Sequence, residues 1–198
     1  MDFRNVKSLT IPEGVVKKIT SGGVVLWTAK GDGPDEPTSP LVMVVDDLVA
    51  AGELTANGRP LGSDITLSNG ITLYPKDICR TAANYYYGDK QYSAAIRIVS
   101  AGGMLLDITN YTTLTLIGRS SSATSPRNFR VGGPNASNVD TSSYTNYTDM
   151  KFHDPNAGDV SNAVTLAQYD LTTIKNTYGN IIKLWFSGNA DICELRLE

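Results

Sequence analysis

The chain has 198 residues, of which 41% are hydrophobic and 19% are charged, and its net charge is −3. This length accommodates one domain of roughly 150 residues with its own core and a small additional segment. The small net charge, without a basic run interleaved with aromatic residues, argues against a nucleic-acid partner. No apolar run reaches the roughly 20 residues of a membrane-spanning helix, so we expect no membrane insertion.

Residues 1–29 form the first predicted unit, a small β-meander. Its three extended runs are separated by turns at Pro12-Glu13-Gly14 and Ser21-Gly22-Gly23. Three short strands are only marginally stable alone, so we expect the meander to pack against another surface. Its apolar side chains would supply that attachment contact: Ile11, Ile19, Leu26 and Trp27.

Residues 30–40 have the Gly- and Pro-rich composition of an extended linker. From 41 to 198 we predict a single β domain. Its first apolar run predicts a strand that ends at Asp46-Asp47, or alternatively a short helix with Asp46 as its N-cap. Farther on, Asn69-Gly70 between two apolar runs predicts a hairpin, and residues 78–88 read as a strand or a loop.

The stretch from 94 to 122 shows the clearest period-2 alternation, with apolar residues on one side and Arg or Thr on the other. Further strands are predicted at 129–133, at 150–153 within a long polar region, and at 164–174. The last two strands would form a hairpin around Ser187-Gly188-Asn189. Many short strands without helical periodicity predict an all-β fold, an antiparallel β-sandwich preceded by the meander, with at most one or two short helices.

Two resemblances follow from these residues. The run VKSLTIPEGVVKKITSGGVVLW, at residues 6–27, resembles a short module of bacteriophage structural and tail proteins, which implies a virion component. Residues 65–198, with IRIVSAGG, LTLIGRSSS and IIKLWFSGNADICELRLE, are similar to jelly-roll domains of the carbohydrate-binding-module kind. The second resemblance implies a jelly-roll fold more than a ligand, because this fold hosts many functions.

Aromatic and arginine side chains are the candidate ligand-binding groups. Rigid tyrosine rings with a polar tip suit recognition of sugars or proteins, and arginine adds fork-like donors. The alternative is that these tyrosines pack half-buried on strands. The candidates are Tyr85, Tyr86, Tyr87, Arg119, Arg130, Tyr144 and Tyr147.

Catalytic and metal-binding patterns are weak. His153 is the single histidine and reads as a surface residue, and no G-x-S-x-G elbow occurs. The oxygen-rich loop with Asp154, Asn156 and Asp159 is a weak Ca²⁺ candidate, since it lacks the closing glutamate of an EF-hand loop. We therefore expect no enzyme activity and no cofactor.

Cys79 and Cys193 lie in apolar contexts and match no metal-binding spacing. They read as buried free thiols, with a disulfide between them as the alternative.

The leading functional hypothesis is a non-enzymatic virion component of a bacteriophage, in the tail, a fibre or a head decoration. The meander would bind other virion proteins, and the jelly roll would project outward to contact a host glycan or protein. The N-terminus lacks the layout of a signal peptide, which fits assembly into a particle within the host cytoplasm, and we expect a homo-oligomer such as a trimer. The alternatives are a carbohydrate-binding module of a bacterial enzyme and a purely structural virion protein without a ligand.

Overall fold

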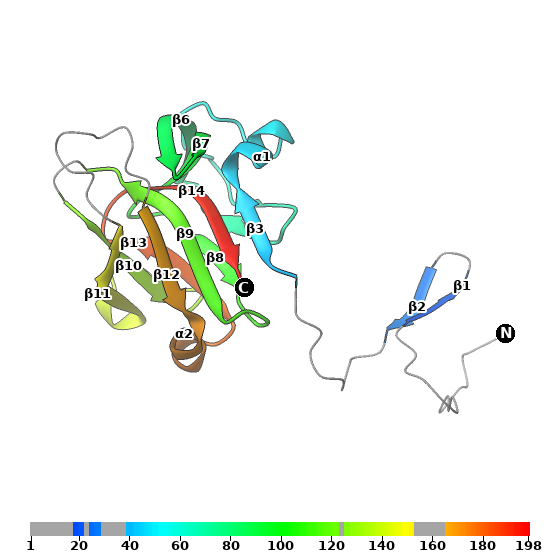
Figure 1. Cartoon of the computed structure of the whole chain (residues 1–198). Coiled ribbons are helices and arrows are strands. Elements are labelled where there is room, and N and C mark those ends of the chain that lie inside the picture. Colours follow the sequence, from blue (N-terminus) through cyan, green and yellow to red (C-terminus); the bar gives the residue numbers. More distant parts are fainter. Residues whose placement is uncertain (1–17, 22–23, 29–38, 123–124, 153–164) are drawn as a thin grey trace. The chain divides into compact units, whose positions relative to one another are not determined.

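The computed structural model describes residues 18–21, 24–28, 39–122, 125–152 and 165–198 (Figure 1). The chain divides into two compact units, Met1–Thr38 and Ser39–Glu198. In the first unit, β1 (Lys18–Ser21) and β2 (Val24–Thr28) form an antiparallel pair in which Ile19 lies opposite Trp27. The predicted strand at 6–11, with Ile11, and most of the predicted linker lie outside the described residues.

The second unit is a sandwich of two antiparallel β-sheets, as the alternation predicted. The first, here the β13 sheet, has the order β11 (Tyr144–Phe152), β10 (Arg127–Gly132), β13 (Ile181–Phe186), β8 (Met104–Asp107), β5 (Thr72–Leu73) and β4 (Ile65–Thr66). The second, here the β14 sheet, has the order β12 (Thr165–Asp170), β9 (Thr113–Ser120), β14 (Ala190–Leu197), β7 (Lys90–Ile98) and β6 (Ile78–Tyr87), and β3 (Leu41–Val44) also pairs with β14.

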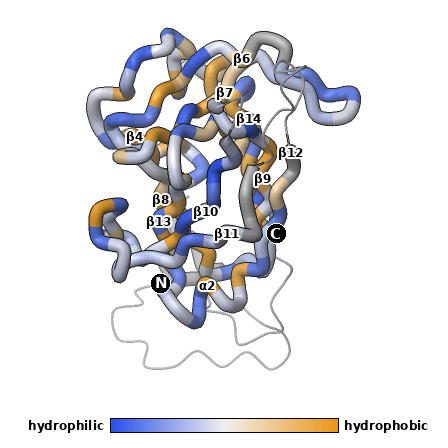
Figure 2. The backbone as a smooth tube through the Cα atoms, turned by 90° about the vertical axis from the view of Figure 1, so that its left-hand side faces the viewer, coloured by the Kyte–Doolittle hydropathy of each residue, from blue (hydrophilic) through white to orange (hydrophobic). Residues whose placement is uncertain are grey.

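The main core lies between the two sheets because each strand turns its apolar positions inward. Ile96 and Ile98 of β7 and Leu114 and Leu116 of β9 are fully buried, as their spacing predicted. The change from hydrophobic to hydrophilic positions can be followed along the strands in Figure 2. Across the core, the ring of Phe129 on β10 stacks on Tyr169 of β12, with ring centroids 3.8 Å apart.

Strand β14 is the centre of its sheet (Figure 1). It pairs with β9 on one side, and on the other side with β7 at Ala190–Ile192 and with β3 at Glu194–Leu197. A register shift between Ile192 and Glu194 marks the change of partner. Such a bulge re-aims the neighbouring side chains.

The predicted hairpin between the last two strands is wrong. β13 and β14 belong to different sheets, so Ser187-Gly188-Asn189 crosses from one sheet to the other. Ser187 donates its backbone N–H to Asn128 O, and Asn189 O accepts from Ser121 N–H, so each sheet holds its own side of the crossing. Length and turn chemistry alone do not distinguish such a crossing from a hairpin.

The described residues hold two α-helices, only partly expected from the sequence, and one 3-10 helix, η1 (Thr141–Ser143). The first run is both strand and helix: β3 ends at Val44 and α1 (Val45–Ala50) follows. Asp46 does not cap α1; its carboxylate accepts the N–H groups of Ser93, at 3.0 Å, and Ala94, at 2.6 Å. The predicted strand at 164–174 is confirmed in its first part as β12 (Thr165–Asp170). The chain then turns helical as α2 (Leu171–Tyr178), because Asp170 caps the helix by accepting from Thr172 N–H at 2.8 Å.

Other details follow the sequence more closely. The Asn69-Gly70 hairpin forms between β4 and β5, and β11 is longer than the predicted strand at 150–153. Cys79 and Cys193 are both buried and free, so the disulfide alternative is wrong. Neither helix has the length and apolarity of a membrane span.

Candidate functional site

A row of paired residues crosses the outer face of the β14 sheet. Ile78 of β6 lies opposite Arg97 of β7, Arg97 lies opposite Asp191 of β14, and Asp191 lies opposite Arg119 of β9. Directly paired residues share one face of a sheet, and their neighbours Ile96, Ile98 and Ile192 are buried in the main core. The row therefore lies on the face that points away from the core.

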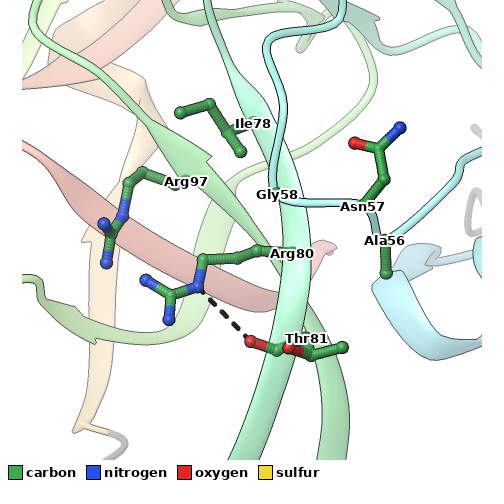
Figure 3. A pocket seen from close by; sticks show the side chains of 7 residues that line it. All are labelled: Ala56, Asn57, Gly58, Ile78, Arg80, Thr81 and Arg97. Carbon is green, nitrogen blue, oxygen red and sulfur yellow. Dashed lines mark hydrogen bonds between the residues drawn. The ribbon is translucent and has the colours of Figure 1, made fainter.

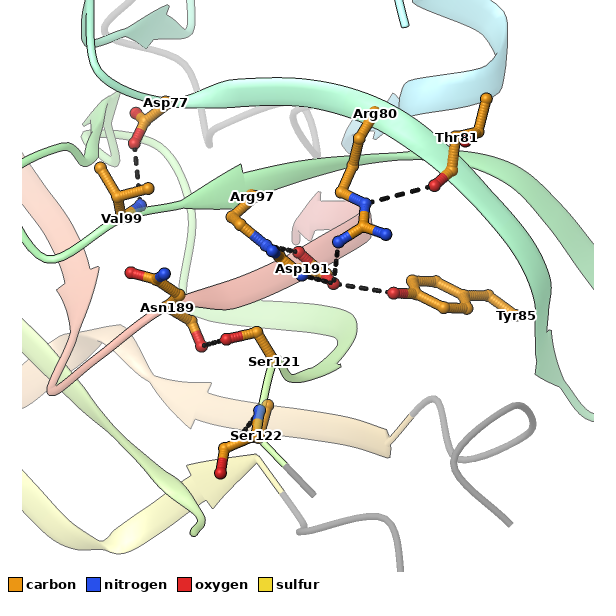
Figure 4. Close-up of polar contacts among 11 residues, drawn as sticks. Asp77, Arg80, Thr81, Tyr85, Arg97, Val99, Ser121, Ser122, Asn189 and Asp191 are labelled. Atoms are coloured by element: carbon orange, nitrogen blue, oxygen red, sulfur yellow. Dashed lines mark hydrogen bonds and ion pairs between the residues drawn. The ribbon is translucent and has the colours of Figure 1, made fainter. Parts of the chain in front are cut away.

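Asp191 is the centre of this row and is completely buried. Arg97 Nε donates to Asp191 Oδ1 at 2.7 Å and Arg97 Nη2 donates to Oδ2 at 3.0 Å, while Tyr85 Oη donates to Oδ2 at 2.7 Å (Figure 4). The hydrogen bonds to Asp191 raise the pKa of Arg97, and burial together with Asp191 raises the pKa of Tyr85 to about 12. The Arg97 fork is thus held rigidly, since a two-point pair fixes its orientation.

Glu194 forms a second ionic centre on the same strand, and it is 1% exposed. Its carboxylate accepts from Lys90 Nζ at 2.6 Å, Tyr92 Oη at 3.0 Å and Arg196 Nε at 2.5 Å. Burial acts to raise the pKa of Glu194, but these hydrogen bonds together hold it below its usual value. Charged partners therefore compensate the loss of water around the carboxylate.

The β6–β7 hairpin covers this outer face. Tyr85 and Tyr92 pair with each other toward the end of the hairpin, yet their hydroxyls reach Asp191 and Glu194. Seven residues of straight strand would separate Tyr85 from the row at Ile78 by roughly 23 Å, so the hairpin must bend at its register shift between Thr81 and Tyr85. Its underside packs on Ile117 of β9 and Cys193 of β14 in a second small apolar cluster, to which the hairpin contributes Ala82, Tyr85, Tyr92 and Ala95.

A polar pocket of about 280 Å³ opens beside the network, here the arginine pocket (Figure 3). The Arg80 and Arg97 side chains lie on the same side of β6 and remain 34% and 24% exposed. None of the described lining residues is acidic. They are Ala56, Asn57, Gly58, Ile78, Arg80, Thr81 and Arg97.

A second pocket of about 340 Å³ lies where the loops after Asn69 and Asp107 meet the start of β3 and the end of β14. Its lining includes Asn69, Asp107, Asn110 and Tyr111. Hydrogen bonds from the Thr109 hydroxyl and N–H lower the pKa of Asp107. The pocket thus has neutral donors and an acceptor carboxylate, unlike the arginine pocket.

Another buried carboxylate precedes β6. Asp77 is completely buried and accepts N–H hydrogen bonds from Tyr74 at 3.3 Å, Val99 at 3.2 Å and Gly103 at 3.0 Å. Burial raises its pKa to about 7, although the backbone hydrogen bonds act in the opposite direction. A Cβ atom at Gly102 would lie 1.7 Å from Asp77 Oδ1, so glycine is required there.

The structure separates the residues that the sequence grouped as ligand-binding. Arg119 lies over the Tyr85 ring, 4.5 Å from its centroid, inside the covered face of the β14 sheet. Tyr86 is half-buried and Tyr87 is 38% exposed near the end of the hairpin. Arg130 lies over the Tyr144 ring on the β13 sheet, at 5.1 Å.

Tyr147 lies next to Phe129, with ring centroids 5.8 Å apart. Trp185 is 1% exposed and contacts Tyr144 edge-on at 5.0 Å. These residues therefore do not converge on one site. Four candidates lie outside the described residues: His153, Asp154, Asn156 and Asp159. The structure also does not describe the side chains of Ile19, Leu26 and Trp27. Among the described residues, no three His, Cys, Asp or Glu residues are placed to hold a metal ion.

Sequence reasoning missed the residues that build the arginine pocket. Arg97 was placed on the wet side of its strand, but Arg80, Asp191 and Glu194 drew no attention. The available signal was the pattern ADICELRL, where two acidic residues and Arg196 interrupt a run of apolar residues. Acidic residues in such a strand require buried partners of opposite charge.

Comparisons with known proteins give only distant similarities. No protein-family model matches the chain, and no curated protein matches it. Among solved structures, a protein from work on glycan recognition in the Ruminococcus flavefaciens cellulosome superposes with a TM-score of 0.44 and 10% identity, over 82% of this chain and 96% of that one. The K2 cleaved adhesin domain of Lys-gingipain superposes with a TM-score of 0.43 and 8% identity, over 81% and 98%. Superpositions this loose carry no argument about function.

Proposed function

We propose that the unit Ser39–Glu198 is a non-enzymatic recognition domain that binds a glycan in the arginine pocket. The observation that carries this proposal is a concave polar site whose donors are fixed before binding. Asp191 holds the Arg97 fork at two points, and Arg80 and Thr81 lie on the same strand. Fixed donors lose little conformational entropy on binding, which favours recognition of hydroxyl-rich ligands.

The state of the nearby carboxylates supports binding rather than catalysis. A general acid or base must reach the proton that it transfers. Asp191 and Glu194 are instead buried and already accept from arginine, lysine and tyrosine donors. Their charge stabilises the site and is not directed at a ligand.

A glycan array probed with the full chain tests this function. We expect binding to a bacterial surface glycan, and we expect Thr81→Tyr to block it, because Thr81 is exposed and lines the pocket. Gln168→Tyr is the matched control, since it adds the same ring at an exposed position on β12, the opposite edge of the sheet. Failure of every glycan to bind, or equal binding by both variants, would reject the proposal.

A second proposal concerns the biological setting: the unit Met1–Thr38 attaches the chain to a bacteriophage particle. The sequence of residues 6–27 motivates it, and the described β1–β2 pair fits the predicted meander. In this proposal the chain is an oligomer, such as a trimer, and the sandwich contacts the host. The alternative setting is a bacterial enzyme that carries the sandwich as its binding module.

Truncation separates attachment from folding. A chain that begins at Leu41 should keep its melting temperature but lose incorporation into particles, as detected by mass spectrometry of purified virions. A full-length chain that never enters particles would contradict the phage setting. Genes for portal or capsid proteins beside this one would favour it, and a neighbouring glycosidase gene would favour the alternative.

A further inference from the structure

The arginine pocket carries more positive charge than its buried carboxylate requires. Arg97 alone gives Asp191 a two-point hydrogen bond. Arg80 Nη1 lies 3.8 Å from Asp191 Oδ2, which is beyond hydrogen-bond distance. Within the described residues, the hydrogen bond that Arg80 donates runs from Nε to Thr81 O at 3.3 Å. Arg80 therefore forms an ion pair with Asp191 through Nη1 but, among the described residues, no hydrogen bond through its terminal nitrogens, which keep donors for a ligand.

The other polar groups of the pocket also act as donors. Asn57 Oδ1 already accepts the N–H of Arg59 at 2.9 Å, so the Asn57 amide nitrogen is the part left for a ligand. Thr81 also lines the pocket at an exposed position. A concave surface with donors and no acidic lining residue is complementary to a group that only accepts hydrogen bonds.

The charge of this region runs against that of the whole protein. The chain has a net charge of −3, whereas Arg80, Arg97 and Arg119 surround Asp191 on this face. The other buried carboxylate there, Glu194, has its own cations, Lys90 and Arg196. The Arg80 and Arg97 side chains are only 34% and 24% exposed. Partial burial reduces solvent screening, which strengthens attraction for an anion.

We propose that the arginine pocket binds an oxyanion carried by a glycan, either the carboxylate of an acidic sugar or a phosphate ester. Arg80 is the principal contact, and Arg97, held by Asp191, is the second. The planar guanidinium fork matches both oxyanions in two-point geometry, which a lysine ammonium cannot reproduce. This inference rests on the proposed function, since it names the chemical class of the ligand for the same site.

Titration of the full chain with three small probes tests the inference. The probes are glucuronate, glucose 1-phosphate and glucose, followed by isothermal calorimetry and by the NMR signals of the arginine Nε–H groups. We expect at least one of the two anions to bind and to shift the Arg80 signal, and glucose not to bind at the same concentration. Binding of glucuronate alone identifies a carboxylate as the group, and binding of glucose 1-phosphate alone identifies a phosphate.

Charge variants sharpen the test. Arg80→Ala should weaken binding of the anion by about tenfold or more, because a charge-assisted hydrogen bond contributes roughly 1.5–3 kcal/mol. Arg80→Lys should retain part of the affinity, since it keeps the charge without the fork. Lys175→Ala on α2 removes the same charge elsewhere and should change nothing. Raising the salt concentration from about 50 mM to about 500 mM should weaken binding to the wild type.

Three results would overturn the inference: neither anion binds, glucose binds as tightly as the anions, or Arg80→Ala binds like the wild type. Its failure can be distinguished from failure of the proposed function. If only neutral glycans bind on the array, and Thr81→Tyr blocks them, the proposed glycan recognition stands and the proposed anion specificity is rejected. If the anionic probes bind through Arg80 but no glycan on the array binds, the anion site stands and glycan recognition is rejected.

Discussion

Asp191 and Asp77 are both completely buried carboxylates, but the protein stabilises them in different ways. Asp191 accepts from the Arg97 guanidinium and the Tyr85 hydroxyl. Asp77 accepts from three backbone N–H groups, and its pKa rises to about 7. Burial disfavours the charged form of Asp77, and among the described residues Asp77, unlike Asp191, has no guanidinium in direct contact.

The comparison indicates what each site contributes. A directly paired carboxylate fixes a neighbouring arginine and so shapes a binding surface. A carboxylate held by peptide groups instead closes a turn, here the one at Gly102 and Gly103. Removing one member of a directly paired set of charges should therefore cause the largest loss of stability. The carboxylate bound by peptide groups should contribute most to the pH dependence of stability.

The largest expected loss of stability follows from removing the Asp191 carboxylate. Asp191→Ala should lower the free energy of unfolding by about 3–5 kcal/mol, because it leaves the half-buried Arg97 charge without its partner. Urea unfolding measures this loss. The double variant Asp191→Ala with Arg97→Ala should recover part of it, and equal losses in the single and double variants would show that the pairing itself does not matter.

The next effect is the pH dependence that Asp77 causes. Between about pH 4 and pH 7 the folded state keeps a proton on Asp77 that the unfolded chain has released. The free energy of unfolding therefore falls as the pH rises through this range, and the contribution of Asp77 becomes constant above about pH 7. Asp77→Asn should be less stable than the wild type, since its amide N–H₂ group faces backbone donors. The difference in unfolding free energy between the two should shrink by about 2–3 kcal/mol from pH 5 to pH 8. A constant or growing difference would contradict the raised pKa.

Glu194 should show an intermediate effect. Glu194→Gln keeps the shape of the side chain but removes the charge that Lys90 and Arg196 contact. Both cations remain nearly half exposed, at 46% and 43%, so water can replace the lost partner. We expect a loss of about 1–2 kcal/mol in urea unfolding. A loss as large as that of Asp191→Ala would remove the distinction between the two ionic centres.

The smallest effect is expected for Arg196. Its exposed side chain gains little from an ion pair in water, so Arg196→Ala should cost less than about 1 kcal/mol. The same measurement at high salt should show an even smaller difference. A loss above about 2 kcal/mol would show that Arg196 belongs to the buried part of the network.

Local patterns sufficed for much of the fold. The alternation around Ile96 and Leu114 predicted buried strands, and Asn69-Gly70 predicted its hairpin, because both depend on neighbours in the sequence. The sheet crossing at Ser187–Asn189 and the cap at Asp170 were missed. A crossing is decided by which distant strand offers hydrogen bonds, and this information is absent from the segment itself.

The arginine pocket was harder to predict for the same reason. Arg80 and Arg97 share a face only because β6 and β7 pair in one register. Asp191 joins them from nearly a hundred residues away, through the pairing of β14 with β7. The tyrosines that the sequence favoured include Tyr85, whose hydroxyl is directed at Asp191.

The central place of β14 also constrains how the chain reaches its native state. Its partners β3 and β9 precede it by roughly 150 and 75 residues, so its sheet has no middle until residues 190–197 have been synthesised. Contacts this far apart in sequence close large loops, and proteins dominated by them fold slowly, in milliseconds to seconds. The nascent chain must therefore expose the unpaired edges of β3, β7 and β9 during synthesis, so we expect its yield in a cell to depend on chaperones and temperature.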